Sequence, residues 1–224
     1  MFFGFMFYNR TINRKGKRGG KVMLQKYMMA KEFYTTEKAG LIQQSMHRYS
    51  ISSYILFFFT FSFAGWLWEV LLHVFIDHTV VNRGVLYGPW LPIYGFGGVL
   101  ILLLLRRFAE RPLQVFLMTM LTAGTMEFVT GTVLWKVYQM RWWDYRDSLI
   151  NLKGFVCLEG LLLFGTGGLV ILYFAAPKLN VRYRKLPDTF RTVLCICFLG
   201  IFIIDVIFSL MHPNAGFGVT IPRP

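Results

Sequence analysis

The sequence predicts an all-α integral membrane protein with five transmembrane helices, a cytoplasmic N-terminus and an external C-terminus. Three observations lead to this fold class. Hydrophobic residues make up 55% of the 224 residues, they gather in five long blocks, and the basic residues concentrate on one side of those blocks. A soluble domain of this size needs an apolar core, but not one this large.

The five apolar blocks define the predicted helices. A helix rises about 1.5 Å per residue, so about 20 residues cross the roughly 30 Å of hydrocarbon in a bilayer. Most blocks are near that length, whereas the second is short unless its glycine-rich lead-in is included. The predicted helices cover residues 50–76, 91–105, 113–138, 154–176 and 190–211.

The same blocks divide the chain into three parts. Residues 1–49 form a basic, partly disordered cytoplasmic arm, residues 50–211 the transmembrane domain, and residues 212–224 a short external tail. The arm holds ten Lys or Arg residues, so we expect it to rest on anionic lipid headgroups. Its apolar run precedes its basic run, which is the reverse of a signal peptide.

The charge distribution predicts the orientation of the chain. Of its 24 Lys and Arg residues, eighteen lie in residues 1–49, 106–112 and 177–191, while the other loops and the tail hold five. An excess of basic residues marks the cytoplasmic side of a membrane protein. No folded soluble module accompanies these residues, so the expected partner is the lipid bilayer and not nucleic acid.

An internal repeat is visible in the sequence. Residues 84–101 align without a gap on residues 154–171, with six identities, of which four are glycines. The preceding helices both carry Ala-Gly and then a glutamate, Glu69 or Glu127. These matches predict a duplicated two-helix unit plus a fifth helix, with both copies in the same orientation because each contains an even number of crossings. Chance alignment of glycine-rich segments remains the alternative.

Acidic residues inside the apolar blocks form the candidate site. An acid at the centre of a membrane helix costs about 2.5–3.5 kcal/mol on insertion scales, so such residues usually face a partner or a wet cavity. Glu69, Glu159 and Asp205 lie about five to seven residues from the outer helix ends, and Glu127 about eleven. Arg83 and most other basic candidates for pairing lie in the outer loops, so the polar cluster is expected in the outer half of the membrane.

Two interpretations of this cluster stay open. It is either a solute or proton site that opens to the exterior, or a set of ion pairs that holds the bundle together. Residues 142–145 of the outer loop are richer in aromatic residues than an interfacial belt requires. Two interpretations stay open, part of such a belt or a lid over the site. The candidate substrate-binding or proton-coupling residues are Glu69, Arg83, Glu127, Trp143, Asp144, Tyr145 and Glu159.

An ordered set of motifs resembles one known family. The set consists of Gly65-Trp66-x-x-Glu69, Arg83-Gly84-x-x-x-Gly88-Pro89-x-x-Pro92-x-Tyr94-Gly95-x-Gly97, Glu127-x-x-x-Gly131, Trp143-Asp144-Tyr145 and Asn151-x-x-Gly154-x-x-Cys157. Over about residues 50–180 it resembles the bacterial ABC-transporter permease family that is called CmpB-like or type IV. The chain departs from the family pattern at Arg146, where a small hydroxyl residue is usual, and at Phe155–Val156.

The resemblance implies a multi-pass protein of the bacterial cytoplasmic (inner) membrane. Within its motifs, one group of residues is assigned a structural role, mainly in keeping the backbone irregular at the outer mouth of the second helix. This group consists of Gly84, Gly88, Pro89, Pro92, Tyr94, Gly95, Gly97, Asn151 and Gly154.

The sequence and the resemblance together predict a membrane transport protein, in the role of the permease subunit of an ABC-type transporter. The sequence contains no Walker motif, zinc-spaced histidine cluster or nucleophile elbow. We therefore expect no metal or cofactor, and an ATPase would be a separate chain, for which residues 177–189 are the better candidate contact. Further copies of this chain are also candidate partners.

Two other functions remain as alternatives. The first is an integral-membrane enzyme that acts on a lipid or envelope precursor, with Glu69 or Glu127 as general base. The second is a non-catalytic membrane scaffold.

Overall fold

The computed structural model describes residues 17–45 and 48–216. The start of the predicted cytoplasmic arm, residues 1–16, and the end of the predicted external tail, residues 217–224, lie outside the described residues. The chain divides into two compact units, residues 1–43 and 44–224.

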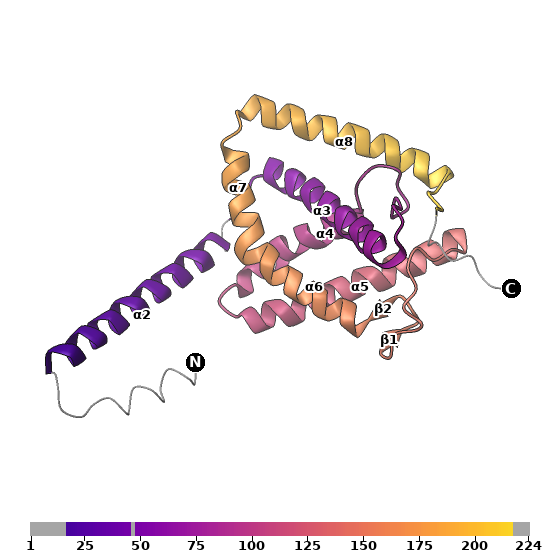
Figure 1. Cartoon of the computed structure of the whole chain (residues 1–224). Helices are drawn as coiled ribbons and strands as arrows, with labels where there is room; N and C mark the ends of the chain where they lie inside the picture. Colours follow the sequence, from indigo (N-terminus) through magenta and orange to yellow (C-terminus); the bar gives the residue numbers. More distant parts are fainter. Residues whose placement is uncertain (1–16, 46–47, 217–224) are drawn as a thin grey trace. The chain divides into compact units, whose positions relative to one another are not determined.

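Helices dominate both units (Figure 1). In chain order the elements are α2 (Lys17–Ser45), α3 (Ile51–Asp77), α4 (Pro92–Leu100), the π-helix η1 (Ile101–Leu105), the 3₁₀-helix η2 (Arg106–Phe108), α5 (Pro112–Tyr138), β1 (Asn151–Leu152), β2 (Val156–Cys157), α6 (Leu158–Val170), the π-helix η3 (Ile171–Ala175), α7 (Ala176–Arg184) and α8 (Asp188–Met211).

The N-terminal arm contains the helix α2, which runs for 29 residues from Lys17 to Ser45. Its described side chains from Met23 to Glu37 are exposed. Part of the arm that the sequence predicts to be partly disordered is therefore helical. Its position on the cytoplasmic membrane surface stays a prediction.

Four helical runs are long and apolar enough to cross a membrane. They span Ile51–Ile76, Pro112–Tyr138, Leu158–Arg184 and Asp188–Met211, with 24 to 27 residues each. They correspond to four of the five predicted helices. The protein is therefore a mainly helical, multi-pass membrane protein.

One of these runs differs from its predicted bounds. The sequence predicts a helix over residues 154–176 and a loop over residues 177–189, but the helical run begins at Leu158 and continues through α7 to Arg184. Pro177 does not end the run because it occupies the first turn of α7, where its missing N–H is tolerated. Figure 1 shows the bend where η3 joins α6 to α7, as a π-helical turn produces.

The second predicted helix, over residues 91–105, is shorter than the four runs. A helical run extends from Pro92 to Phe108, but it changes from α to π at Ile101 and to 3₁₀ at Arg106. Pro92 marks its start, since proline fits the first turn of a helix. The run is not among the four candidate spans, so its status as a fifth crossing stays a prediction.

The large unit contains two closely packed helix pairs, α3 with α4 and α5 with α6. Glycines bring the helices of each pair together. A Cβ on Gly95 would meet Phe58 and a Cβ on Gly165 would meet Phe116. The two glycines, in α4 and α6, are thus 70 residues apart, and the two residues that they contact, in α3 and α5, are 58 residues apart. The same two shifts relate the contact of Gly98 with Phe61 to that of Gly168 with Thr119.

Two further features recur at the 70-residue shift. The π-helices begin at Ile101 and Ile171. Gly84 and Gly154 both have positive φ angles, of 98° and 71°, which glycine adopts most readily. These are aligned positions of the predicted repeat, and the duplication itself stays a prediction.

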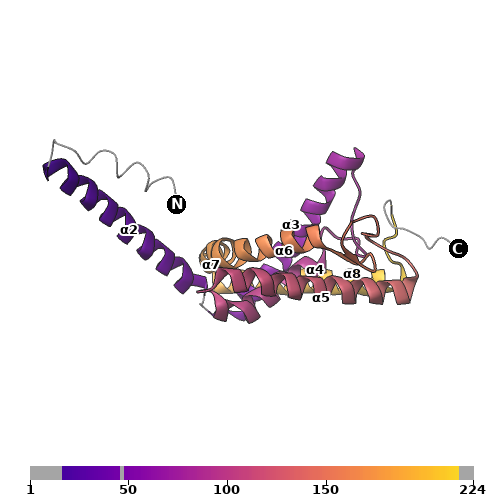
Figure 2. The same cartoon turned by 90° about the horizontal axis from the view of Figure 1, so that it is seen from below.

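Hydrogen bonds gather the connecting segments at two opposite ends of the large unit. At one end, Ser53 Oγ donates to Asn180 Oδ1 over 2.9 Å and Tyr173 Oη donates to the Ala109 carbonyl over 2.6 Å. This end holds the basic segments 106–112 and 177–191. The other end holds residues 78–91, 139–157 and 212–216, and we call it the loop end. In Figure 2 the end of α3 stands out of the layer that the other helices form.

Candidate functional site

The first loop, residues 82–91, is anchored to α8 by Asp205. The carboxylate of Asp205 accepts hydrogen bonds from Tyr87 N over 3.1 Å, from Gly88 N over 2.8 Å and from Trp90 Nε1 over 2.7 Å. Ser209 Oγ adds a fourth contact at 3.2 Å. Because the carboxylate is occupied by these donors, we assign Asp205 a structural role in the loop.

Asn214 joins the first loop to the second loop, residues 139–157. Its backbone N–H donates to the Val85 carbonyl over 2.9 Å, and its side chain donates to the carbonyls of Asn82 and Gly84. Its own carbonyl accepts from Trp142 Nε1 over 2.9 Å. Sequence reasoning missed this residue, because a lone asparagine in a short tail has no distinguishing pattern.

Glu69 is the first carboxylate of the site and has two partners. The Tyr94 hydroxyl donates to Glu69 Oε1 over 2.6 Å. Arg83 Nε lies 4.0 Å from Glu69 Oε2, while Arg83 Nη2 donates to the Trp142 carbonyl over 2.8 Å. The Arg83 side chain is 11% exposed and that of Glu69 24%. Arg83 therefore lies beside an acid, whereas the location of this pair in the outer half of the membrane stays a prediction.

Gly65 makes the contact between Tyr94 and Glu69 possible. A Cβ on Gly65 would overlap Cγ of the Tyr94 ring, so only a glycine lets the tyrosine ring lie flat against α3. The phenol then reaches one helical turn further along α3, where Glu69 lies on the same face. This geometry explains why glycine and glutamate are four residues apart in the first motif.

Glu127 is the second carboxylate, and its side chain is more deeply buried. The residue is 5% exposed, and its Oε2 has no hydrogen-bond partner among the described residues. Tyr145 approaches it closely enough for a side-chain hydrogen bond, and Glu69 lies close enough for the two carboxyl charges to interact. The structure thus brings Glu69, Arg83, Glu127 and Tyr145 together, and their role in binding a solute or a proton stays a prediction.

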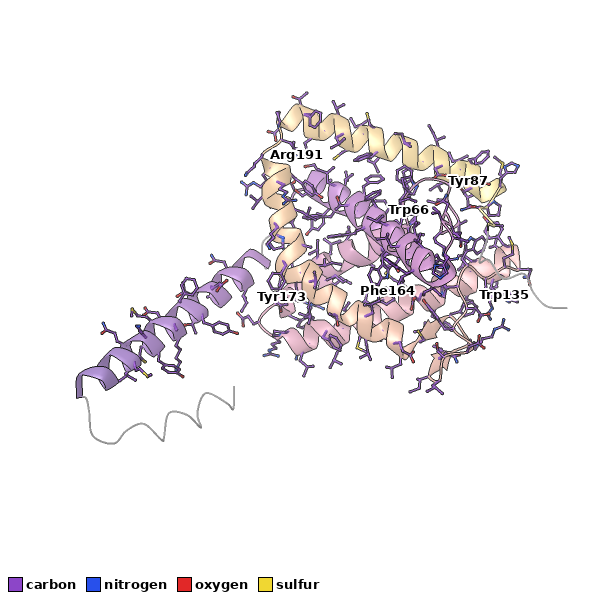
Figure 3. All side chains as sticks on the ribbon, in the orientation of Figure 1. Trp66, Tyr87, Trp135, Phe164, Tyr173 and Arg191 are labelled. Carbon is purple, nitrogen blue, oxygen red and sulfur yellow. The ribbon has the colours of Figure 1, made fainter. Side chains whose placement is uncertain are left out.

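Glu127 does not have the partners that Tyr94 and Arg83 provide for Glu69, although the repeat places a residue at each equivalent position. Phe164 occupies the position of Tyr94 and has no hydroxyl. The two rings contact each other, with centroids 5.9 Å apart, and Figure 3 shows Phe164 on the side of α6 that faces α3. Lys153 occupies the position of Arg83, but its Nζ lies 6.0 Å above the Phe128 ring. Equivalent positions therefore carry different chemistry.

Tyr145 reaches the site from the second loop. Its backbone N–H donates to the Gly154 carbonyl over 2.8 Å, which fixes the loop near α5. Burial raises the pKa of the Tyr145 phenol far above its ordinary value, and the nearby charges of Glu127 and Glu69 raise it further. The phenol therefore remains neutral and can donate a hydrogen bond to Glu127.

Asp144 and Trp143 stabilise the second loop and do not enter the carboxylate cluster. Asp144 binds Arg146 through three side-chain hydrogen bonds, the shortest of 2.5 Å, and lies 3.9 Å from Arg141. Burial raises the pKa of Asp144, but the hydrogen bonds and charge of Arg146 outweigh it, so the pKa lies below 3.8. Trp143 Nε1 donates to the Phe155 carbonyl over 2.9 Å. Arg146, the departure from the family motif, thus has a structural partner.

A short hairpin completes the second loop. Strands β1 and β2 pair in antiparallel fashion, with Asn151 opposite Cys157. Asn151 Oδ1 accepts from the Gly154 N–H over 3.0 Å, and Gly154 has its positive φ at this turn. Next to the hairpin, Gly131 leaves room for the Phe155 ring, on which the guanidinium of Arg141 stacks at 4.2 Å. Asn151 and Gly154 therefore have the structural roles expected of them.

Glu159 lies apart from the two buried carboxylates. It is exposed in the first turn of α6, beside Cys157. The predicted depth of about five residues is wrong because α6 begins at Leu158. Within the described residues, no group of three or more His, Cys, Asp and Glu side chains could hold a metal ion.

The remaining motif residues of the first loop shape its packing on α8. Gly88 lies against the Trp90 ring, and Pro89 lines a groove of about 480 Å³ between the loop and α8. Gly97 has open space where a Cβ would be, with Met126 Sδ at 4.0 Å. Gly88 and Pro89 therefore have identifiable packing roles, whereas nothing in the structure explains Gly97.

One family profile matches the chain. Its description is "Putative ABC-transporter type IV", and it matches residues 56–210. The matched segment includes both helix pairs, both loops and all the candidate site residues. No curated protein and no solved structure matches the chain. The chain therefore belongs to the type IV ABC-transporter family, as its motifs predict.

Proposed function

We propose that this protein is the permease subunit of an ABC-type transporter, with a polar site that opens to the exterior. The site consists of Glu69, Arg83 and Glu127, with Tyr145 above them. The observation that carries the proposal is the convergence of two carboxylates from two different helix pairs. A single acid would be explained by one structural ion pair, whereas the second acid, Glu127, has no ion-pair partner among the described residues and is left for a solute or a proton.

The distribution of basic residues supports an orientation with the N-terminus inside and the C-terminus outside. The end that holds residues 106–112 and 177–191 carries eight Lys or Arg residues, and the arm adds ten more. The carboxylate cluster lies toward the loop end, beneath Trp142 and Tyr145. Under the positive-inside rule this end faces the exterior of a bacterial cytoplasmic membrane.

A parallel duplication accounts for the arrangement of the two carboxylates. The repeated glycine contacts, π-helices and positive-φ glycines all recur at the same shifts. Glu69 and Glu127 are themselves 58 residues apart, the shift that relates α3 to α5. Two equivalent helix pairs about an axis along the membrane normal would bring equivalent glutamates face to face. In this arrangement the run from Pro92 to Phe108 is the fifth crossing.

The exposed basic residues of α7 and its C-terminal end are the proposed contact for a separate ATPase subunit. Asn180 and Pro177 are buried, while four basic side chains are exposed. This helical surface replaces the loop that the sequence predicts at 177–189. The exposed basic residues are Lys178, Arg182, Arg184 and Lys185.

Ligand-induced thermal shifts of the purified protein would test the site. We expect at least one compound from a broad solute panel to raise the melting temperature of the parent protein, and Glu127→Gln and Arg83→Ala to remove that shift. Glu159→Gln is the matched control, because it makes the same charge change at an exposed position. If both site variants respond to every solute as the parent does, the site proposal fails.

A further inference from the structure

The buried cluster contains more acidic than basic groups. Two carboxyl groups, Glu69 and Glu127, lie near one guanidinium, that of Arg83. If both acids were ionised, the cluster would carry one uncompensated negative charge in a region that excludes water. Such a charge is costly because the low local dielectric does not screen it.

Glu69 has two partners in the cluster. Arg83 Nε lies 4.0 Å from Oε2, and the Tyr94 hydroxyl donates to Oε1 over 2.6 Å. The guanidinium of the cluster is therefore a partner of Glu69.

The surroundings of Glu127 favour a neutral carboxyl group. It is 5% exposed, and Oε2 has no hydrogen-bond partner among the described residues. The other nearby basic side chains have different partners, since Lys153 lies above Phe128 and Arg141 lies beside Asp144 and Phe155.

Charged and titratable groups from every neighbouring element enter this balance. On α3, His73 Nδ1 lies 2.9 Å from the Glu69 carbonyl oxygen. On α5, Lys136 is exposed. The groups whose charges or dipoles bear on the cluster are Glu69 from α3, Tyr94 from α4, Arg83 from the first loop, Tyr145 from the second loop, and Cys157 and Glu159 from β2 and α6.

We propose that Glu127 binds a proton at neutral pH, while Arg83 and Tyr94 remain the partners of Glu69. A proton needs no cavity, which suits a side chain enclosed by Tyr145 and the helix pairs. The proton neutralises the second carboxyl group without requiring a further cation. The binding of a proton by Glu127 does not depend on the proposed function. The role of the proton does rest on it, because in a transporter release of the proton would accompany movement of a solute.

Infrared spectroscopy of the protein in lipid nanodiscs at constant sodium concentration tests the inference. We expect the parent protein to show, at neutral pH, the carbonyl stretch of a protonated carboxylic acid in an amount of about one group per chain. Glu127→Gln should remove this band, and Glu159→Gln should retain it. Absence of the band from the parent protein, or its persistence in folded Glu127→Gln, would overturn the assignment.

Glu69→Gln provides a second test that does not remove the proposed proton-binding group. The band should persist in this variant, because the proton is bound by Glu127. Loss of the band from folded Glu69→Gln would overturn the assignment of the proton to Glu127. If the band behaves as expected but no solute shifts the melting temperature, the proposed transport function fails and the inference about Glu127 stands.

Discussion

The two helix pairs of the large unit have matching scaffolds but different polar chemistry. In both pairs, glycines at equivalent positions bring the helices together, and a π-helix follows at the same place. Glu69 in the first pair has a tyrosine hydroxyl and an arginine as partners. In the second pair, Phe164 takes the position of Tyr94, and Glu127 keeps one carboxyl oxygen without a partner among the described residues.

This difference shows how a repeated scaffold can carry an asymmetric site. Helix packing depends on small residues and shape, which the two pairs share. The state of each carboxyl group depends instead on a few donors and charges beside it. Replacing one hydroxyl and redirecting one basic side chain is enough to give the two glutamates different roles.

The largest effect is expected where the first pair depends on a glycine that the second lacks. Gly65→Ala would place a Cβ within the space of the Tyr94 ring, whereas Ala123 already occupies the equivalent position in α5. We expect the free energy of unfolding to fall by about 3 kcal/mol, because α4 must move away from α3. Thermal denaturation in detergent would measure it.

Gly167→Ala is the matched control for this substitution. Gly167 also lies in a helix, but nothing lies within 4 Å of the place that a Cβ would take. Stability should stay the same or rise by about 0.5–1 kcal/mol, since alanine favours helix over glycine. Equal losses in the two variants would contradict the assigned role of Gly65.

The next effect concerns the hydroxyl group that distinguishes the pairs. Tyr94→Phe gives the first pair the phenylalanine of the second and removes the 2.6 Å hydrogen bond to Glu69. We expect a loss of about 1.5–3 kcal/mol in stability, because a hydrogen bond to a charged group is lost. Chemical denaturation followed by tryptophan fluorescence would measure it. Phe164→Leu is a control that removes ring area without removing a hydrogen bond. If Tyr94→Phe lost no more stability than Phe164→Leu, the Tyr94 hydroxyl would have no stabilising role.

A smaller effect separates the two aligned basic residues. Arg83→Met removes a contact to Glu69 and a 2.8 Å hydrogen bond to the Trp142 carbonyl, so we expect a loss of about 1–2 kcal/mol. Lys153→Met should change stability by less than about 0.5 kcal/mol, since its contact is with the Phe128 ring. Melting curves of both variants under identical conditions would compare them. A larger loss of stability in Lys153→Met than in Arg83→Met would contradict the assigned difference between these two basic residues.

The smallest effect is expected in the second loop at low pH. The pKa of Asp144 lies below its ordinary value because Arg146 binds the ionised form more strongly than burial opposes it. Asp144 therefore stabilises the loop above pH 3.8, and this contribution is lost as the pH falls through its lowered pKa. Trp142 and Trp143 fluorescence should report loosening in strong acid.

Asp144→Asn should reduce this acid-dependent change, whereas Asp147→Asn, at an exposed neighbouring position, should retain it. An identical acid transition in Asp144→Asn and the parent protein would show that Asp144 does not hold the loop.

Much of this architecture could be predicted because its signals are local. Apolar blocks predict helices by length alone, and the order Gly65, Glu69, Arg83, Glu127 and Tyr145 placed the site residues in the correct loops and helices. The sequence also placed Asp205 within an apolar helix. Its hydrogen bonds to the first loop could not be foreseen, because backbone N–H donors leave no mark in a sequence.

The remaining features depend on contacts between distant segments. The Asn214 side chain contacts three carbonyls of the first loop, more than 120 residues away, and a single asparagine does not predict such contacts. The continuation of the fourth helix past Pro177 depends on the π-helical turn before it. The different surroundings of Glu69 and Glu127 follow from the contact of Tyr94 with α3, which requires the packing of Gly65.

The inequality of the two carboxyl groups is the central claim, and labelling with a hydrophobic carbodiimide would test it most directly. Such reagents modify protonated carboxyl groups in apolar surroundings. Peptide mapping by mass spectrometry at neutral pH should find Glu127 labelled and Glu69 largely unlabelled. Equal labelling of both residues, preferential labelling of Glu69, or labelling of neither would contradict the account.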